Sequence, residues 1–328
     1  MIDYLNIIRW KNLLFIALIQ WLMQHTVVFP ILQTYQFDTE INTLYGYLMI
    51  FSTVLIAAGG YVINDYFDVK IDRINKPEKV IVTEKISKKA TMLFYQILTG
   101  IGISAGIFLS LLTNSFLLSF IFIIVPGMLW FYAASYKRQF IWGNVVVSFL
   151  AALVILLVGI LEISILKRSY DDLLFQTNIP KIIYSWTGGF AFFAFLTTWI
   201  REIIKDIQDE IGDREMECRT MPIKWGTKKT KYFIYGLITL TISALFIANF
   251  ILIPFDEEIT LQYFIFGLIL PLVGLAYLIF KAKTPEDFKQ TSTLTKFIML
   301  IGILYSFVFY FLEAKLYKLD FFGLFIIK

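Results

Sequence analysis

The stretch VLIAAGGYVINDYFDVKID, residues 54–72, joins an apolar run to a set of acids. Its first ten residues are apolar or small, and Asp65, Asp68 and Asp72 then follow within eight positions. On a helix with about 100° per residue, the spacing i, i+3, i+7 places the three carboxylates within about 60° on one face. The stretch therefore predicts a hydrophobic helix whose end carries an acidic stripe.

The chain as a whole has the composition of a polytopic membrane protein. Its 328 residues are 58% hydrophobic and only 16% charged, with a mean hydropathy of +0.73, which is more apolar surface than a soluble core uses. A spanning helix takes about 20 apolar residues, and nothing alternates with the two-residue period of a membrane barrel. We expect an all-α protein with nine transmembrane helices, near 12–30, 42–63, 91–113, 115–135, 141–162, 183–203, 231–254, 261–281 and 296–313.

The Lys and Arg residues predict the orientation of these helices. Of the 29, 23 fall at the N-terminus or in the segments 64–90, 136–140, 201–231 and 281–296, and six fall on the other side. Short cytoplasmic loops are enriched in Lys and Arg. We therefore expect a single integral domain, residues 1–328, in the cell inner membrane with its N-terminus cytoplasmic. The segment 163–182 is then an outer loop, and 321–328 is too short to cross.

The acidic spacing recurs at the end of the sixth expected helix. In REIIKDIQDEIGDRE, residues 201–215, Asp206, Asp209 and Asp213 repeat the i, i+3, i+7 pattern. Charged residues between membrane helices are commonplace, so one stripe alone indicates a solvated helix end. Two matching stripes, both on the expected cytoplasmic side, favour a shared function.

Clustered carboxylates repel one another, so we expect a cation between them. The single histidine, His25, lies in the outer half of the first helix and the single cysteine is Cys218, so oxygen ligands and hence magnesium, manganese or calcium are indicated. Magnesium completes its coordination with water and substrate phosphate. The basic residues that flank the stripes would complete a diphosphate clamp; they are Lys70, Arg73, Lys76, Lys79, Arg201, Lys205 and Arg214.

Both stripes resemble the aspartate motifs of one family. NDYFDVKID resembles the NDxxDxxxD motif of the UbiA superfamily of intramembrane prenyltransferases, and KDIQDEIGD resembles its second motif, DxxDxxxD. The resemblance implies a helical bundle around a central cavity that is open to lipid, with the active site facing the cytoplasm. It also implies Mg²⁺-dependent transfer of a polyprenyl group from its diphosphate to a lipophilic acceptor, within membrane lipids and without a nucleic-acid partner.

The resemblance assigns roles by position. Asp65, Asp68, Asp206 and Asp209 would be catalytic and would hold two magnesium ions, with Asn64 beside the first pair and Asp72 and Asp213 in support. Contacts with the diphosphate are expected from Asn64, Lys137, Arg73, Lys205, Arg9, Asn12 and Asn144. For Lys137 the alternative is an ordinary cytoplasmic charge.

Other positions match the family only in part. The segment Asn75–Pro77 resembles the basic, proline-containing stretch after the first motif, but Glu78 and Val80 stand where many relatives are more basic. Three aromatic residues near the 136–142 link could stabilise a carbocation, although an interfacial aromatic belt is the favoured interpretation; they are Tyr132, Tyr136 and Trp142.

The second motif also bears on the acceptor. REIIKDIQDEIGD looks most like the branch that makes digeranylgeranylglyceryl phosphate, which implies geranylgeranylglyceryl phosphate as the acceptor; an aromatic acceptor of quinone biosynthesis is the runner-up. A transporter would belong to a different class, and its ionisable groups usually lie near the membrane midplane. Transport is disfavoured because no Asp, Glu, Lys or Arg is expected deep in the first five helices. A binding or scaffold role without chemistry is equally disfavoured.

Overall fold

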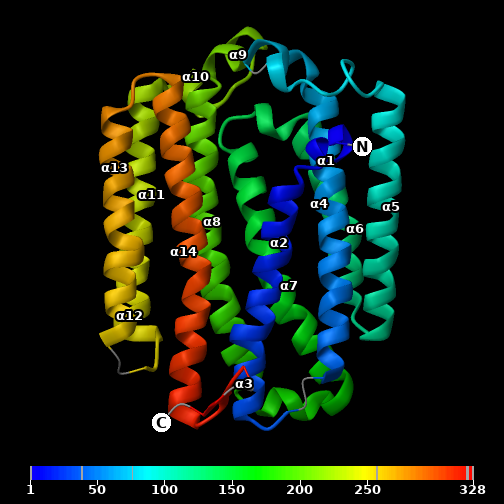
Figure 1. Ribbon diagram of the computed structural model, residues 1–328, viewed down its shortest axis with the longest axis vertical. Helices are drawn as coiled ribbons and strands as arrows, with labels where there is room; N and C mark the ends of the chain where they lie inside the picture. The colour runs from blue at the N-terminus through cyan, green and yellow to red at the C-terminus, as the bar shows by residue number, and fades with distance from the viewer. Residues whose placement is uncertain (1, 38–39, 76, 256–257, 323–324, 327–328) are drawn as a thin grey trace. The chain divides into compact units, whose positions relative to one another are not determined.

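A computed structural model describes residues 2–37, 40–75, 77–255, 258–322 and 325–326, and Figure 1 shows that helices dominate. The elements are α1 (Ile2–Ile7), α2 (Trp10–Leu22), η1 (Met23–Val28), α3 (Phe29–Thr34), α4 (Glu40–Asn75), η2 (Pro77–Lys79), α5 (Lys88–Leu112), α6 (Phe116–Ala134), η3 (Tyr136–Arg138), α7 (Trp142–Tyr170), η4 (Asp171–Gln176), α8 (Ile179–Gln208), α9 (Glu210–Glu215), α10 (Met221–Trp225), α11 (Thr227–Ile247), η5 (Ala248–Leu252), α12 (Glu258–Gln262), η6 (Tyr263–Ile269), α13 (Leu270–Lys281), α14 (Pro285–Tyr317), β1 (Asp320–Phe321) and β2 (Phe325–Ile326).

The described residues contain nine helical stretches that are long and apolar enough to cross a membrane, which confirms the all-α class and the expected number of spans. They are Trp10–Thr34, Asn42–Asn75, Lys88–Leu112, Phe116–Ala134, Trp142–Gln176, Ile179–Gln208, Thr227–Leu252, Glu258–Lys281 and Pro285–Tyr317. Several exceed the expected bounds because helical hydrogen bonding continues past the end of the apolar run.

The prediction that residues 163–182 form a loop is wrong over most of this range. Helix α7 continues to Tyr170, the short helix η4 follows, and α8 begins at Ile179. Ile163, Ile165 and Leu166 extend the buried side of α7, so packing carries the helix beyond the predicted end. As a result Glu162, expected at the end of a span, lies inside α7 and is buried. This also corrects the expectation that the first five spans carry no acid in their interior.

The chain forms two compact units. The first comprises Met1–Lys137 and Leu153–Gly188, and the second Arg138–Ala152 and Gly189–Lys328. Helices α7 and α8 therefore each contribute residues to both units.

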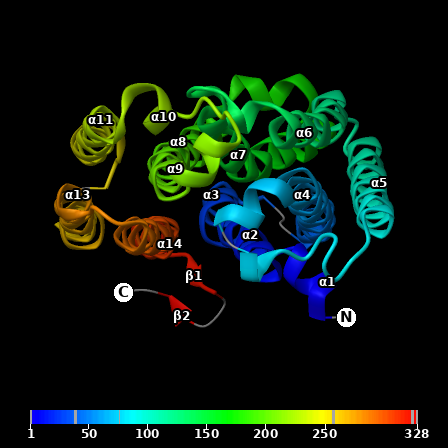
Figure 2. The ribbon, with the colours of Figure 1, turned by 90° about the horizontal axis from the view of Figure 1, so that it is seen from above.

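In the first unit, α4 packs along α2, α5 and α6, as Figure 2 shows from above. Helices α4 and α5 approach closely at glycines, because the absence of a side chain lets two backbones come together. A Cβ on Gly102 of α5 would lie 2.9 Å from Ile56 Cγ1 and 3.2 Å from the Ile56 backbone nitrogen. The close contact holds the motif-bearing helix α4 against its neighbour.

In the second unit, α13 packs against α11 and α14. The start of α14 is set by a capping box: the Thr284 hydroxyl accepts a bond from the Asp287 amide (3.3 Å), and the Asp287 carboxylate accepts one from the Thr284 amide (2.9 Å). Such caps satisfy backbone donors that a helix leaves open. After α14, the two-residue strands β1 and β2 pair antiparallel, the one departure from helix among the described elements.

Candidate functional site

The first aspartate motif lies on an unbroken helix. Helix α4 runs from Glu40 to Asn75, so the expected loop 64–90 begins twelve residues later than predicted. Val69 and Ile71 are buried between the acids, and their packing maintains the helix where charge density alone suggests a loop. The helical spacing of Asp65, Asp68 and Asp72 is therefore real.

Cations and an amide from three other positions surround the first motif. Arg9 Nη2 lies 2.8 Å from Asp65 Oδ1, and Lys137 Nζ forms an ion pair with Asp68 Oδ1. The side-chain amide nitrogen of Asn64 donates to Asp68 Oδ2 at 2.8 Å, and its side-chain oxygen Oδ1 accepts a hydrogen bond from Lys137 Nζ at 3.3 Å. The structure thus brings five of the predicted site residues together within one unit.

Arg9 reaches this group because the chain turns sharply there. Its φ of 53° lies in the left-handed region, and it separates α1 from α2. The guanidinium also lies 5.0 Å from the ring centre of Tyr61, within range of a cation–π interaction. Burial would lower the pKa of Arg9, but the charges of Asp65, Tyr61 and Asp72 and the hydrogen bond to Asp65 together outweigh it, so this pKa is raised. Asn12, also predicted, is half-buried one turn along α2.

Arg73 points to a different partner. Its guanidinium pairs with Glu84 at 2.8 Å and donates to Thr83 at 3.1 Å, so it holds the following loop. That loop is anchored by apolar contacts: Val82 and Ile86 belong to a buried cluster with Ile7, Val62 and Val69. Val80 is buried too.

This packing explains why the loop departs from the basic family pattern: the apolar positions form core. Lys76 lies outside the described residues. Asp72, the last acid of the motif, is half-buried.

The second motif spans the junction of two helices. Asp206 lies in α8, Asp209 lies between α8 and α9, and Asp213 lies in α9. Asp209 has φ −98° and ψ 10°, yet its amide still bonds the Lys205 carbonyl (2.9 Å) and Asp213 bonds the Asp209 carbonyl (3.2 Å). The helical repeat therefore continues through a distorted turn. Asn144, buried at the start of α7, donates to Asp206 Oδ2 at 2.8 Å.

One acid next to this motif was missed from the sequence. Glu202 is buried one turn before Asp206 and accepts contacts from Arg201 at 2.8 Å and from Lys205 at 2.7 Å. Lys205, predicted as a diphosphate ligand, is thus held by this carboxylate. The signal that could have found Glu202 is its position at i−4 from Asp206, on the same helical face.

The aromatic candidates differ in exposure. Tyr136 and Trp142 are exposed, which favours an interfacial belt for these two side chains. Tyr132 is half-buried.

The donor set fits magnesium, with substrate oxygens needed to complete its coordination. Among the described residues, no group of three or more His, Cys, Asp or Glu side chains could hold a metal alone. Each motif offers carboxylate and amide oxygens, the ligands magnesium prefers, and magnesium usually takes one or two carboxylates plus phosphate and water. Two carboxylates of the first motif, Asp65 and Asp68, already form ion pairs with Arg9 and Lys137.

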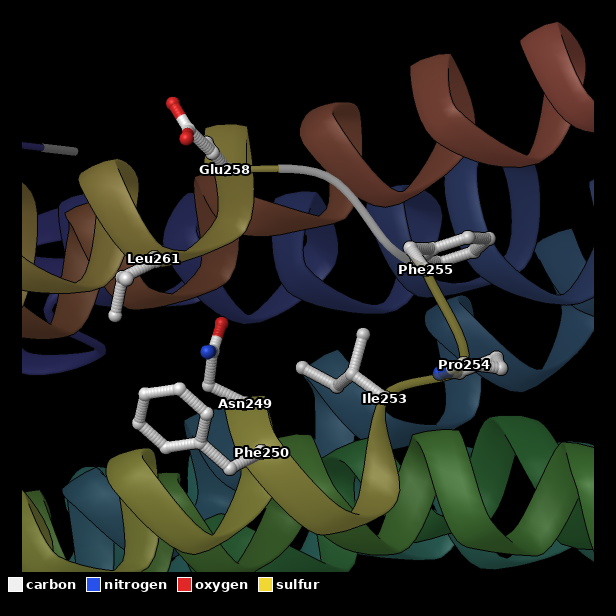
Figure 3. Close-up of a pocket in the computed structure, with 7 residues that line it drawn as sticks. All are labelled: Asn249, Phe250, Ile253, Pro254, Phe255, Glu258 and Leu261. Carbon is white, nitrogen blue, oxygen red and sulfur yellow. The ribbon is translucent and has the colours of Figure 1, made fainter.

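A pocket of ≈ 360 Å³ opens elsewhere in the second unit, between η5 and α12. Figure 3 shows the lining residues that the structure describes, and Glu258 is the only ionisable one among them. It contains no motif residue, so it is not the candidate site.

The chain is similar to known proteins. The model of the UbiA prenyltransferase family matches residues 28–302. A digeranylgeranylglyceryl phosphate synthase of Methanosphaera stadtmanae is 30% identical over 269 residues, 80% of this chain and 88% of the relative. One of Saccharolobus solfataricus is 33% identical over 253 residues, 76% of this chain and 79% of the relative.

Solved structures agree. A digeranylgeranylglyceryl phosphate synthase superposes with a TM-score of 0.63 at 26% identity, covering 94% of this chain and 97% of that one. A UbiA homologue from Archaeoglobus fulgidus bound to DMAPP and Mg²⁺ superposes with a TM-score of 0.55 at 14% identity, over 93% of this chain and 99% of that one, and shows the shared fold.

Proposed function

The chain belongs to the UbiA prenyltransferase family and is an integral membrane prenyltransferase, and we propose that it makes an ether bond between a polyprenyl group and geranylgeranylglyceryl phosphate. The polyprenyl group comes from an allylic prenyl diphosphate, and the reaction depends on Mg²⁺. The acceptor is supported by the names of relatives at 30–33% identity, which are digeranylgeranylglyceryl phosphate synthases. The prenyl donor and Mg²⁺ are supported by the Archaeoglobus homologue, which holds DMAPP and Mg²⁺.

The observation that carries this proposal is a pair of aspartate motifs that each end a membrane helix. They lie at the ends of the second and sixth of nine spanning stretches of the described chain, and helices of even number end on the same side of a membrane. Each motif already has a partner that holds its carboxylate in place, Lys137 for Asp68 and Asn144 for Asp206. We therefore propose that both motifs bind the diphosphate of the donor through magnesium.

The residues divide the work by their chemistry. Asp65, Asp68, Asp206 and Asp209 would hold the magnesium, supported by Asp72 and Asp213. When bound, Mg²⁺ supplies the positive charge that stabilises the departing diphosphate. Arg9 and Lys137 exchange their carboxylate partners for diphosphate oxygens, and Asn12 lies close to Arg9 along the chain. Arg73 and Lys205, which contact Glu84 and Glu202, would have to leave these partners to bind the diphosphate. Asn64 and Asn144 keep Asp68 and Asp206 in orientation.

The new bond forms between the acceptor hydroxyl oxygen and the allylic carbon, while the bond from that carbon to the diphosphate breaks with its electron pair. The hydroxyl proton passes to a carboxylate or to the released diphosphate. Neither motif includes a histidine, so no imidazole takes that role. The apolar membrane helices exclude water from the allylic cation.

The site faces the cytoplasm in this proposal, with the N-terminus on the same side and the protein in the cell inner membrane. The Lys and Arg distribution supports that orientation. Residues 1–328 act as one catalytic domain, because the family match crosses from one compact unit into the other.

The test is a competition between acceptors. Purified full-length protein is incubated with Mg²⁺, geranylgeranyl diphosphate, geranylgeranylglyceryl phosphate and aromatic acids such as 4-hydroxybenzoate. We expect digeranylgeranylglyceryl phosphate to be the main product and EDTA to abolish it. Prenylated aromatics without the ether lipid would reject the assigned acceptor and favour quinone biosynthesis.

A further inference from the structure

A polar stripe continues along α8 from the second motif toward the interior of the membrane helix. Lys205, Glu202, Arg201 and Thr198 precede Asp206 at helical spacing, so they lie on one side of α8. From Arg201 to Asp206 the axis rises about 7.5 Å, at 1.5 Å per residue. The stripe thus starts at the metal-binding acids and extends past them along one helix.

Glu202 organises two cations within this stripe. Its Oε1 contacts Arg201 Nη1 at 2.8 Å and its Oε2 contacts Lys205 Nζ at 2.7 Å. Glu202 and Arg201 have side chains that are only 10% and 20% exposed, so the group is largely shielded from water. Arg201 and Lys205 thus share one buried carboxylate.

Two buried donors in the stripe lack a hydrogen-bond partner. In the part of the chain that the structure describes, these are Arg201 Nε and Thr198 Oγ1, and Thr198 is only 5% exposed. Buried polar atoms without partners are rare and costly. Because Glu202 pairs with Nη1, Nε is the donor of this guanidinium that remains for a ligand. The edge of arginine that carries Nε binds phosphate through two parallel hydrogen bonds.

We infer that Arg201, held by Glu202 and aided by Thr198, binds the phosphate monoester of the acceptor and is not a ligand of the leaving diphosphate, an assignment that rests on the proposed function. In a glyceryl phosphate, the reacting hydroxyl and the phosphate are attached to the same three-carbon unit, so they lie a few ångström apart. A phosphate subsite about one and a half helical turns from Asp206 therefore holds the hydroxyl beside the allylic carbon. The subsite therefore distinguishes the phosphorylated acceptor from its dephosphorylated alcohol.

The test compares two acceptors in the full-length protein with Mg²⁺ and geranylgeranyl diphosphate. One is geranylgeranylglyceryl phosphate, and the other is its dephosphorylated alcohol. Arg201→Gln is expected to raise KM for the phosphorylated acceptor by about 10- to 100-fold, the effect of losing a charged hydrogen bond. KM for the prenyl diphosphate and kcat/KM for the alcohol are expected to change less than twofold, so the preference for phosphate disappears.

Two further variants define the effect. Arg201→Lys keeps the positive charge but cannot form two parallel hydrogen bonds to a phosphate. Its KM for the phosphorylated acceptor should therefore lie between those of the wild type and Arg201→Gln, and this variant remains informative if the glutamine variant does not fold. Arg219→Gln is the matched control, because Arg219 is an exposed arginine in the same unit. It should leave both acceptors unaffected.

A rise in KM for geranylgeranyl diphosphate with equal losses for both acceptors would overturn the inference and assign Arg201 to the leaving group. Calorimetric titration of geranylgeranylglyceryl phosphate without the donor separates the two proposals. Binding by the wild type that is weakened by Arg201→Gln, without turnover of either acceptor, supports the subsite and refutes the proposed function. No binding of this acceptor to the wild type would refute the subsite itself.

Discussion

At the scale of single residues, the site is a set of carboxylates whose charge the protein compensates before substrate binds. Lys137 pairs with Asp68 and Arg9 with Asp65, so the acids stay close without the mutual repulsion that clustering causes. The same cations are the natural partners of an incoming diphosphate. In the proposed function, the protein exchanges one set of ion pairs for another when it binds the donor.

Replacing Lys137 with Met should damage both stability and activity. The substitution leaves Asp68 buried without its cation, which costs about 3 kcal/mol, and it removes a diphosphate contact, so kcat/KM should fall about 10- to 100-fold. Thermal unfolding in detergent and a prenyl transfer assay measure the two effects.

The double variant Asp68→Asn/Lys137→Met separates them. It should regain most of the thermal stability, because neither buried charge remains, but it should stay inactive because a metal ligand is lost. A single Lys137→Met variant as stable as the wild type would contradict the buried ion pair.

Asn144 should matter for donor binding more than for folding. Its side-chain amide donates to Asp206 Oδ2 at 2.8 Å, and Asn144→Leu removes this bond, which orients the carboxylate. We expect the apparent KM for the prenyl diphosphate in Mg²⁺ to rise at least about 10-fold. Asn249→Leu, in the pocket of Figure 3, is the control. Equal kinetics for both variants would exclude a role for Asn144 in holding Asp206.

The sequence predicted the acids of the site but not all of their partners. Aspartates at i, i+3 and i+7 are visible from spacing alone, because a helix has a fixed period. Arg73 was assigned to the diphosphate and is found on Glu84, and Glu202 was missed although it holds Arg201 and Lys205. Ion pairs of this kind depend on where a loop packs and on which side-chain rotamer is buried away from water. Neither can be read from the spacing of residues in the sequence.

At the scale of elements, the first motif depends on how α4 packs. The predicted bounds of the membrane span followed hydropathy and ended at residue 63, whereas the helix continues through the acidic stripe to Asn75. Hydropathy shows which residues are apolar, but a helix can continue past the apolar run as long as its buried face packs against other residues. Val69 of α4 provides such a contact in the cluster with Val82 and Ile86. The same effect extended α7 beyond Glu162.

The close approach of α4 and α5 gives a test with an internal control. Gly102→Val places atoms against the side chain and backbone of Ile56, whereas a Cβ on Gly100 of the same helix meets nothing within 4 Å. We expect Gly102→Val to destabilise the protein by about 1–3 kcal/mol and Gly100→Val to be neutral. Thermal unfolding in detergent measures both. Equal melting temperatures would show that this contact does not hold α4.

At the scale of the whole molecule, the single cysteine makes the orientation testable. In a Cys218→Ser background, cysteines are placed at the exposed Lys228 and Lys181, and intact cells are treated with a membrane-impermeant maleimide. Lys181→Cys should be labelled from outside, and Lys228→Cys only after the cells are opened. The reverse pattern would invert the membrane orientation proposed from the Lys and Arg distribution.

The central claim is that both aspartate motifs take part in binding the magnesium–diphosphate group of the donor. Its most direct test is the affinity of the full-length protein for an unreactive geranylgeranyl thiolodiphosphate in Mg²⁺, measured by calorimetry. Asp65→Asn/Asp68→Asn and Asp206→Asn/Asp209→Asn should each weaken binding by about 100-fold or more, because each removes charged ligands of the same group. Unchanged affinity in either double variant would show that its motif does not take part in the site.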